Sequence, residues 1–299
     1  MSLLVIGTLA LDKIETPYDS RDEALGGSAT YFAYASAKFN PVSLVGVVGT
    51  DFPACELEAL QAHGVDISGV EVAVGDTFRW AGRYEANWNT RHTLDTQLGV
   101  FEHWEPKVLG DLQDAKYVFL ANAAPSVQAK ALDQCKGAEF VMLDTMNLWI
   151  DIAKDDLIAV LKRVNGVVLN DEEATMLTGE SNLFKAAKAV LELGPDFVVL
   201  KKGEHGAFLI GKDVHFSLPA YPVENVVDPT GAGDSFAGGF MGYVASCQNT
   251  QPSTLRRAML YGTVTASFCV EGFSMEVLSK KSRGLVEERF NELLEITTI

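Results

Sequence analysis

The second half of the chain alternates short apolar runs with amphipathic stretches, and this alternation constrains the fold most strongly. Five runs are expected to be strands: Tyr117–Leu120, Phe140–Leu143, Val167–Leu169, Phe197–Leu200 and Ala207–Ile210. Helices are expected among them at 126–136, 154–163, 171–178 and 182–193. Continuously apolar strands that alternate with helices predict a mostly parallel sheet with helices on both faces. The predicted fold class is therefore α/β, with three layers in the order α/β/α.

The first half begins in the same way but contains a segment of different character. Apolar runs at Leu3–Gly7 and Val42–Val48 predict buried strands, and helices are expected from Ser28 and over 52–63. Residues 70–103 are instead rich in aromatic and charged residues, with exposed strands expected at 70–74 and 77–88. This segment is predicted to be an insertion into the α/β core. Three helices are expected to finish the chain, at 231–246, 253–270 and 284–296.

Charge and composition exclude several classes of function. The formal net charge of −16 over 299 residues argues against binding to a nucleic-acid backbone or an anionic membrane. No uncharged run is long enough to span a bilayer, and the amino terminus lacks the basic region of a signal peptide. The four cysteines are far apart and contain no CxxC pair, so buried free thiols are expected. These features predict a cytoplasmic protein.

The strongest chemical signal is the string from Asp228 to Phe240, which reads DPTGAGDSFAGGF. Gly231, Ala232 and Gly233 are expected in the first turn of a helix, where N–H groups lack intrahelical partners. Small side chains there let an anion approach the backbone, and the helix dipole stabilises it. Asp234 follows at once, in position to accept a proton from a hydroxyl that attacks a bound phosphate. A Gly-rich helix start with a favourably placed Asp is the simpler alternative.

This string closely resembles the signature of the ribokinase-like (PfkB) family of carbohydrate and nucleoside kinases. The resemblance implies that Asp234 is the catalytic base and that Gly231, Ala232 and Gly233 form the anion hole. It also implies that substrate binds at Asp12 and at the double glycine, here Gly26-Gly27-Ser28. Members often carry an Asn shortly after the double glycine, whereas this sequence continues Ala29-Thr30-Tyr31-Phe32.

The resemblance further implies one ribokinase-like domain over 1–299, with a β-sheet lid formed by about 12–20 and 70–103. In the lid, Phe78, Trp80, Tyr84 and Trp88 share one face of an alternating run. Those aromatic rings could stack on a nucleobase, or pack against another strand or a second subunit in a homodimer. Arg79, Arg83 or Arg91 could reach substrate or phosphate from above, or be solvated.

The implied cofactors are ATP and Mg²⁺, and K⁺ would bind near Asp228 if this chain follows some members. Asn170 and Glu173 match the family's Asn-x-x-Glu motif and could order water around Mg²⁺, although the same residues also suit a capping box. Asp144 to Asn147 follow a strand and could line the same crevice. The remaining ATP contacts are expected at Lys201, Gly203, Gly206, Thr230, Ser267 and Gly272.

The predicted activity is ATP-dependent phosphorylation of a hydroxyl group on a sugar or ribonucleoside. The aromatic lid and the Gly-Gly-Ser variant favour an adenosine-kinase-like nucleoside kinase. A sugar kinase of the ribokinase or fructokinase type is the first alternative, and a non-catalytic nucleotide- or sugar-binding regulator is a more remote one. A dinucleotide-dependent oxidoreductase is disfavoured, because G-x-G-x-x-G does not follow the first strand, and no Walker A sequence is present.

Overall fold

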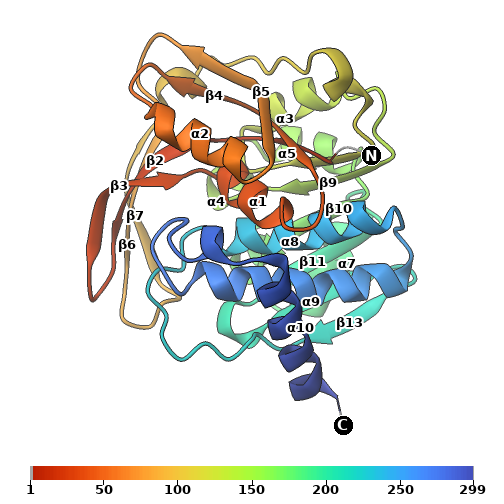
Figure 1. The fold of residues 1–299 in the computed structure, drawn as a ribbon. Helices are drawn as coiled ribbons and strands as arrows, with labels where there is room; N and C mark the ends of the chain where they lie inside the picture. Colours follow the sequence, from red (N-terminus) through yellow and green to blue (C-terminus); the bar gives the residue numbers. More distant parts are fainter. Residues whose placement is uncertain (1–2, 299) are drawn as a thin grey trace.

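The computed structural model describes residues 3–298, which form two β-sheets and their covering helices (Figure 1). The strand order of the large sheet is β13-β12-β11-β10-β9-β8-β1-β4-β5. All its neighbouring strands are parallel except at the β11–β12–β13 edge, which is antiparallel. Its strands are β1 (Leu3–Ile6), β4 (Val42–Gly49), β5 (Val65–Ala73), β8 (Tyr117–Leu120), β9 (Phe140–Asp144), β10 (Gly166–Asn170), β11 (Phe197–Lys201), β12 (Ala207–Gly211) and β13 (His215–Leu218).

Helices cover both faces of the large sheet, as predicted. They are α1 (Ser28–Ser36), α2 (Ala54–Ala62), α3 (Pro125–Leu132), α4 (Asn147–Ile152), α5 (Lys154–Leu161), α6 (Asp171–Thr178), α7 (Leu183–Glu192), α8 (Ala232–Cys247), α9 (Pro252–Cys269) and α10 (Arg283–Thr297). Short 3₁₀ turns lie at Gly99–Phe101, Gly110–Asp114, Gly203–His205 and Leu278–Lys280. No helix within residues 3–298 is both long enough and apolar enough to cross a membrane.

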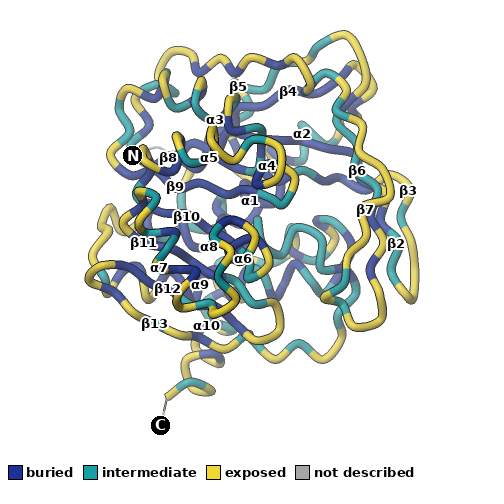
Figure 2. Tube along the Cα trace, turned by 180° about the vertical axis from the view of Figure 1, so that it is seen from behind, coloured by how far each residue is buried: buried dark blue, intermediate teal, exposed yellow. Residues whose placement is uncertain are grey.

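Two hydrophobic cores lie on the two faces of the sheet, because successive side chains of a strand point in opposite directions. In β1, Leu3 and Val5 join the core beneath α1, α8, α9 and α10. Leu4 and Ile6 join the core beneath α3, α5, α6 and α7. The central strands are buried along their whole length, whereas in the small sheet β7 is exposed throughout and β2 is mostly buried (Figure 2). The apolar runs seen in the sequence thus follow from burial on two faces.

The small sheet has the strand order β3-β2-β6-β7 and differs in extent from the predicted lid. Its strands are β2 (Ala10–Glu15), β3 (Ser20–Gly26), β6 (Arg79–Tyr84) and β7 (Arg91–Gln97). The expected exposed strand at 70–74 is instead the end of β5, which pairs in parallel with β4 at the edge of the large sheet. The sequence did not separate these strands because an edge strand of the large sheet is also half exposed.

The small sheet is anchored to the carboxyl-terminal part of the chain. Ser274 Oγ donates a hydrogen bond to the Leu25 carbonyl at 2.6 Å. Arg21 lies 4.3 Å from the ring centre of Phe273. Tyr84 packs in a small core with Ile14, Ala24 and Phe273, and Trp80 and Trp88 pack against it. On the aromatic face of the run 78–88, Tyr84 is therefore buried within the chain, whereas Phe78, Trp80 and Trp88 are half-buried, so packing within the chain accounts for only part of this face.

All four cysteines are free thiols, but only Cys135 and Cys269 are buried, so the prediction of burial was wrong for Cys55 and Cys247.

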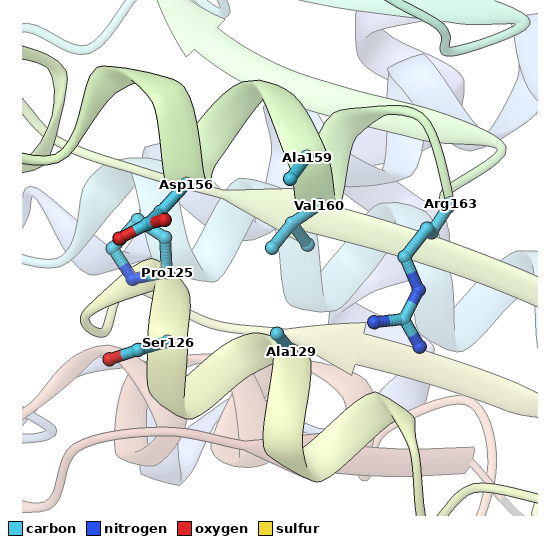
Figure 3. Close-up of a pocket in the computed structure, with 7 residues that line it drawn as sticks. All are labelled: Pro125, Ser126, Ala129, Asp156, Ala159, Val160 and Arg163. Atoms are coloured by element: carbon cyan, nitrogen blue, oxygen red, sulfur yellow. The ribbon is translucent and has the colours of Figure 1, made fainter.

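A groove of about 160 Å³ lies between α3 and α5, lined by residues that include Pro125, Asp156 and Arg163 (Figure 3). Its lining shares no residue with the site described next.

Candidate active site

The carboxyl ends of neighbouring parallel strands bring several of the predicted residues together. Asp144 ends β9, Asn170 ends β10 and Lys201 ends β11. These strands are neighbours, and Asn170 and Lys201 are register partners. In open α/β sheets, ligands bind at this edge of the strands. The Asp144 segment, which the sequence left open, thus lies with the predicted nucleotide-side residues.

The amino terminus of α8 is open for an anion. Gly231 precedes the helix in the left-handed conformation, with φ of 74°. Within residues 3–298, the N–H groups of Gly231 and Gly233 have no hydrogen-bond acceptor. The N–H of Ala232, by contrast, donates to the Pro229 carbonyl at 3.2 Å. Pro229 precedes α8, so the partner of Ala232 is not intrahelical, but this N–H is not open for an anion; Gly231 lies before the first turn rather than in it.

Four charged residues surround this helix start, and we call them the Lys201 cluster: Asp144, Glu173, Lys201 and Asp234. Lys201 Nζ lies 4.0 Å from Asp144 Oδ2. A Cβ atom built on Gly233 would lie 2.7 Å from Lys201 Nζ, so the ammonium group sits directly against the helix start. Burial lowers the pKa of Lys201, but Asp144, Glu173 and Asp234 outweigh it and raise the pKa overall. The lysine therefore remains charged among three carboxyl groups.

The carboxyl groups of this cluster have raised pKa values. Burial, followed by the charge of Asp144, raises the pKa of Asp234 to about 7, and Lys201 opposes the shift. Burial likewise raises the pKa of Glu173 to about 7 and raises the pKa of Asp144. A carboxylate with a pKa near neutrality is well matched to accept a proton from a hydroxyl.

Asn170 and Glu173 form the capping box that the sequence allowed. Asn170 Oδ1 accepts the Glu173 N–H at 2.7 Å, and Glu173 Oε2 accepts the Asn170 N–H at 2.8 Å. Within the described chain, no three His, Cys, Asp or Glu residues lie close enough to hold a metal alone. The residues still fit Mg²⁺, because this ion takes oxygen ligands and keeps several waters beside substrate phosphates. The box would fix Glu173 for such a water-mediated role.

The second half of the site lies at the start of the small sheet, where the double glycine meets Asp12. A Cβ atom on Gly26 would lie 2.0 Å from Asp12 Oδ2, so only glycine leaves room for this carboxyl group. Gly27 has φ of 96°, and a Cβ there would lie 2.4 Å from the Thr8 carbonyl oxygen. The glycines at 26 and 27 are thus required to place Asp12 beside the site.

Asp12, Tyr31 and Asp228 form a second group, which we call the Asp12 cluster. Each contributes a buried oxygen with no hydrogen-bond partner in the described chain: Asp12 Oδ1, the Tyr31 hydroxyl and Asp228 Oδ2. Burial, with the charges of Asp228 and Asp234, raises the pKa of Asp12 to about 8. Burial also raises the pKa of Asp228, to about 6. Buried polar atoms are normally paired, so these oxygens are candidates to bind a ligand or an ion.

The three lid arginines differ in where they lie. Arg79 pairs with Asp51 at 2.8 Å and Glu23 at 3.0 Å, and Arg83 pairs with Glu15 at 2.8 Å. Arg91 is the register partner of Tyr84 and lies 5.6 Å from the Trp80 ring centre. Its charge lowers the pKa values of Asp234 and Glu173, which places it on the side of the sheet that faces the Lys201 cluster.

The other predicted residues occupy varied positions. Ser28 Oγ lies 3.0 Å from Thr8 Oγ1 and donates a hydrogen bond to the Asn122 carbonyl. Thr230 Oγ1 donates a hydrogen bond to the Tyr84 hydroxyl at 3.2 Å. Gly203 and Gly206 begin and follow the 3₁₀ turn after β11. Ser267 bonds to Arg289 and to the Val264 carbonyl, and Gly272 lies near Val277. No hydrogen bond or ion pair joins Ser267 or Gly272 to either cluster within residues 3–298.

Sequence reasoning missed Tyr31 as a site residue and did not foresee the Tyr84–Thr230 bond. The available signal for Tyr31 was the absence of Asn after the double glycine. Tyr84 was recognised only as one member of an aromatic face.

Comparisons with known proteins identify the family to which the chain belongs. The sequence profile of the pfkB family of carbohydrate kinases matches residues 6–279. The cytidine kinase of Thermococcus kodakarensis is 34% identical over 251 residues, which cover 81% of this chain and 87% of that protein. The solved structure of a Burkholderia thailandensis nucleoside kinase in complex with inosine has a TM-score of 0.80 at 19% identity, covering 98% of each chain. A putative ribokinase II from E. coli in complex with ATP and Mg²⁺ also has a TM-score of 0.80, at 21% identity, covering 97% of this chain and 99% of that one.

The class that emerges is that of the phosphotransferases that act on sugars or nucleosides. Within that class, the chain belongs to the pfkB family of carbohydrate kinases.

Proposed function

We propose that this protein transfers the γ-phosphate of ATP to a hydroxyl group of a ribonucleoside, with Asp234 as the general base. The observation that supports it most is the placement of Asp234. Its carboxyl group follows the free N–H of Gly233 directly, lies among groups that include Lys201, and has a pKa of about 7. A base and an anion-binding helix start are thus adjacent, as an in-line transfer between a hydroxyl and a phosphate requires.

The proposed reaction follows from these residues. Asp234 accepts the proton of the acceptor hydroxyl while that oxygen forms a bond to the γ-phosphorus. The bond between this phosphorus and the bridging oxygen breaks, and ADP leaves with the electron pair. Gly231 and Gly233 N–H groups and Lys201 would stabilise the charge on the transferred group. Mg²⁺ would supply further neutralisation of phosphate charge, with Glu173 and Asn170 as its water-mediated partners.

The choice of a nucleoside over a free sugar rests on the relatives. The Thermococcus protein at 34% identity is named a cytidine kinase. Free sugars of the ribose or fructose type are the second candidate, because the residues that hold the phosphate would serve either acceptor.

The test is release of ADP from Mg-ATP with cytidine, inosine, adenosine, guanosine, ribose and fructose in turn. We expect strong turnover with at least one nucleoside and little with the sugars. Asp234→Asn, assayed in parallel, identifies any contaminating activity. Turnover with a sugar alone would replace the nucleoside assignment, and no turnover with any acceptor would contradict the proposed reaction.

Arg91 is proposed to contact the phosphates of ATP from the small sheet, since it faces the Lys201 cluster and, in the described chain, forms no ion pair. Arg91→Met should raise the KM for ATP by roughly three- to tenfold. Arg83→Met is the matched control, because Arg83 pairs with Glu15. Equal KM values in the two variants would remove Arg91 from the site.

Two finer proposals concern K⁺ and assembly. Asp228 is fully buried and its Oδ2 has no hydrogen-bond partner among residues 3–298, which would suit a monovalent cation. Replacing K⁺ by choline in the assay should then lower turnover, and unchanged turnover would argue against this site.

Homodimerisation through the small sheet stays a prediction, which sedimentation of the full chain would test.

A further inference from the structure

Tyr84 joins the small sheet to the loop that precedes α8. It ends β6 and is 7% exposed. Its hydroxyl accepts a hydrogen bond from Thr230 Oγ1 at 3.2 Å, although the two residues lie 146 positions apart in the sequence. Thr230 comes directly before Gly231, whose N–H has no acceptor within residues 3–298. The small sheet therefore makes a direct contact with the segment that carries the proposed phosphate site.

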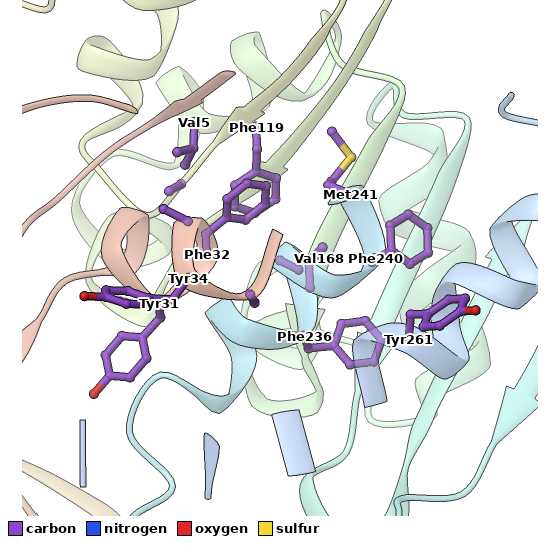
Figure 4. Close-up of a cluster of buried hydrophobic side chains, with 14 of the residues drawn as sticks. Val5, Tyr31, Phe32, Tyr34, Phe119, Val168, Phe236, Phe240, Met241 and Tyr261 are labelled. Atoms are coloured by element: carbon purple, nitrogen blue, oxygen red, sulfur yellow. The ribbon is translucent and has the colours of Figure 1, made fainter. Parts of the chain in front are cut away.

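The loop before α8 takes its shape from side-chain contacts. The Thr230 N–H donates to Asp228 Oδ1 at 2.9 Å, and the Thr230 carbonyl accepts a hydrogen bond from Cys269 Sγ at 3.3 Å. The body of α8 is fixed by the core, where Figure 4 shows Phe236 and Phe240 among the buried side chains. Phe236 lies more than one turn into the helix, so the helix start is positioned by the loop contacts as well as by the core.

The hairpin that carries Tyr84 also carries Arg91 and reaches a second loop. Tyr84 and Arg91 are register partners in β6 and β7. In the turn between these strands, Asn89 Nδ2 donates to Glu204 Oε1 at 3.2 Å, and Glu204 belongs to the 3₁₀ turn after β11. One hairpin thus contacts both the loop before α8 and the turn after β11. These two segments border the Lys201 cluster in the sequence.

The charge of Arg91 acts on both sides of this contact. Burial raises the pKa of Tyr84 to about 12, whereas the charge of Arg91 and the hydrogen bond from Thr230 lower it. Arg91 also lowers the pKa values of Asp234 and Glu173. The guanidinium group is therefore within Coulombic range of the tyrosine and of the cluster at the start of α8.

We propose that Tyr84 is a positioning residue, which acts through Thr230 to align the start of α8 with Arg91 on the same phosphate group of ATP. This inference rests on the proposed function and on Arg91 as a phosphate contact. The Tyr84 hydroxyl touches no reacting atom in this role. It fixes the spacing between N–H donors of the large domain and a guanidinium group of the small sheet. Donors whose spacing is fixed before the ligand arrives bind it more tightly, because less ordering is paid for on binding.

The first experiment measures the Kd of the Mg²⁺ complex of a non-hydrolysable ATP analogue by calorimetry. Tyr84→Phe should raise this Kd about three- to tenfold. In the Arg91→Met background the same substitution should raise it by no more than about twofold, because the group to be aligned is gone. Tyr34→Phe is the matched control, since Tyr34 is also buried but lies against His63 on another part of the chain. An unchanged Kd in Tyr84→Phe, or full additivity with Arg91→Met, would overturn the inference.

Variants of Thr230 test whether Tyr84 acts through this hydroxyl. Thr230→Val keeps the shape of the side chain but loses the donor, so it should weaken binding of the analogue as much as Tyr84→Phe does. Thr230→Ser keeps the donor and should lose less. Equal losses in the Val and Ser variants would overturn the inference.

Thermal unfolding of the same variants separates positioning from stability. A lower Tm in Tyr84→Phe with an unchanged Kd would assign the Tyr84–Thr230 bond to folding alone and overturn the inference. These measurements need no acceptor, so they are distinct from the test of the proposed function. A wild type that binds the analogue but phosphorylates no acceptor would count against the proposed function only, whereas a wild type that does not bind the analogue would remove both.

Discussion

The Lys201 cluster and the Asp12 cluster adjoin each other but balance their charges differently. Lys201 lowers the pKa values of Asp144, Glu173 and Asp234, so these carboxyl groups have a cation within the protein. The charges that act on Asp12 are those of Asp228 and Asp234, and both raise its pKa. Asp12, Tyr31 and Asp228 each keep an oxygen without a partner in the described chain. The carboxyl groups of the first cluster are thus balanced by a cation of the protein, whereas the charges that act on Asp12 in the second cluster are all negative.

Replacing Asp234, the proposed base in the Lys201 cluster, should have the largest effect on activity. Asp234→Asn keeps the size of the side chain but cannot accept the proton, so kcat should fall by about two orders of magnitude or more. The KM for ATP should change little, because the helix start remains. Steady-state assays of ADP release check both values, with the exposed Asp213→Asn as control. Retained kcat in Asp234→Asn would assign the base elsewhere.

Alanine at Gly231 and alanine at Gly233 should lower activity to different extents, because the first meets Tyr31 of the Asp12 cluster and the second meets Lys201. Gly231→Ala forces a side chain into a left-handed conformation and against the Tyr31 ring, so kcat/KM should fall roughly 10- to 100-fold. Gly233→Ala meets only the mobile end of Lys201 and should cost less than about tenfold. The two variants are compared by kcat/KM for ATP and for the acceptor, with Tm as a measure of folding. An equal fall in kcat/KM in the two variants would contradict this expected difference between the two glycines.

Removing the cation of the Lys201 cluster should shift the pH dependence. Asp234 must be deprotonated to act, so kcat/KM of the wild type should rise with pH and level off above about 7. Lys201 lowers the pKa of Asp234, so Lys201→Met should move this rise to higher pH and lower the rate about tenfold at neutrality. A pH profile from 5.5 to 9 measures the shift. An unmoved profile with a lower rate would mean that Lys201 acts only on phosphate.

In the Asp12 cluster, the free energy of unfolding should depend on pH through Asp12, because only negative charges act on this carboxyl group. In the folded chain the pKa of Asp12 is about 8, whereas an unfolded Asp titrates near 4, so the folded state binds more protons between these values. Its contribution to stability is therefore lost as the pH rises through about 8. Asp12→Asn should be more stable than the wild type at pH 8.5, and the difference in the free energy of unfolding should narrow by roughly 3 kcal/mol at pH 6. Exposed Asp111→Asn serves as the control, and a constant gap across pH would contradict the prediction.

The sequence identified the fold and most of the Lys201 cluster because those features are local. Strand and helix periods depend on neighbouring residues, and DPTGAGD carries its own helix start and its own acid. Asn170 and Glu173 were foreseen as a pair since a capping box spans only four residues. The boundary of the small sheet was less predictable, because whether Val65–Ala73 pairs with β4 or with β6 depends on partners distant in the sequence.

By itself, the sequence determined the three-layer α/β fold and the resemblance to the pfkB kinases, and it named the proposed base and the glycines of the candidate site. Only the tertiary structure decided how those parts meet: that Gly26 makes room for Asp12, that Arg91 lies beside Tyr84 while Arg79 and Arg83 form ion pairs, and that the buried Tyr31 hydroxyl has no partner among residues 3–298. The physical reason is that burial and unpaired hydrogen-bonding groups belong to contacts between segments far apart in the chain. A local pattern can predict each segment, whereas the surroundings of each side chain exist only once the segments have packed together.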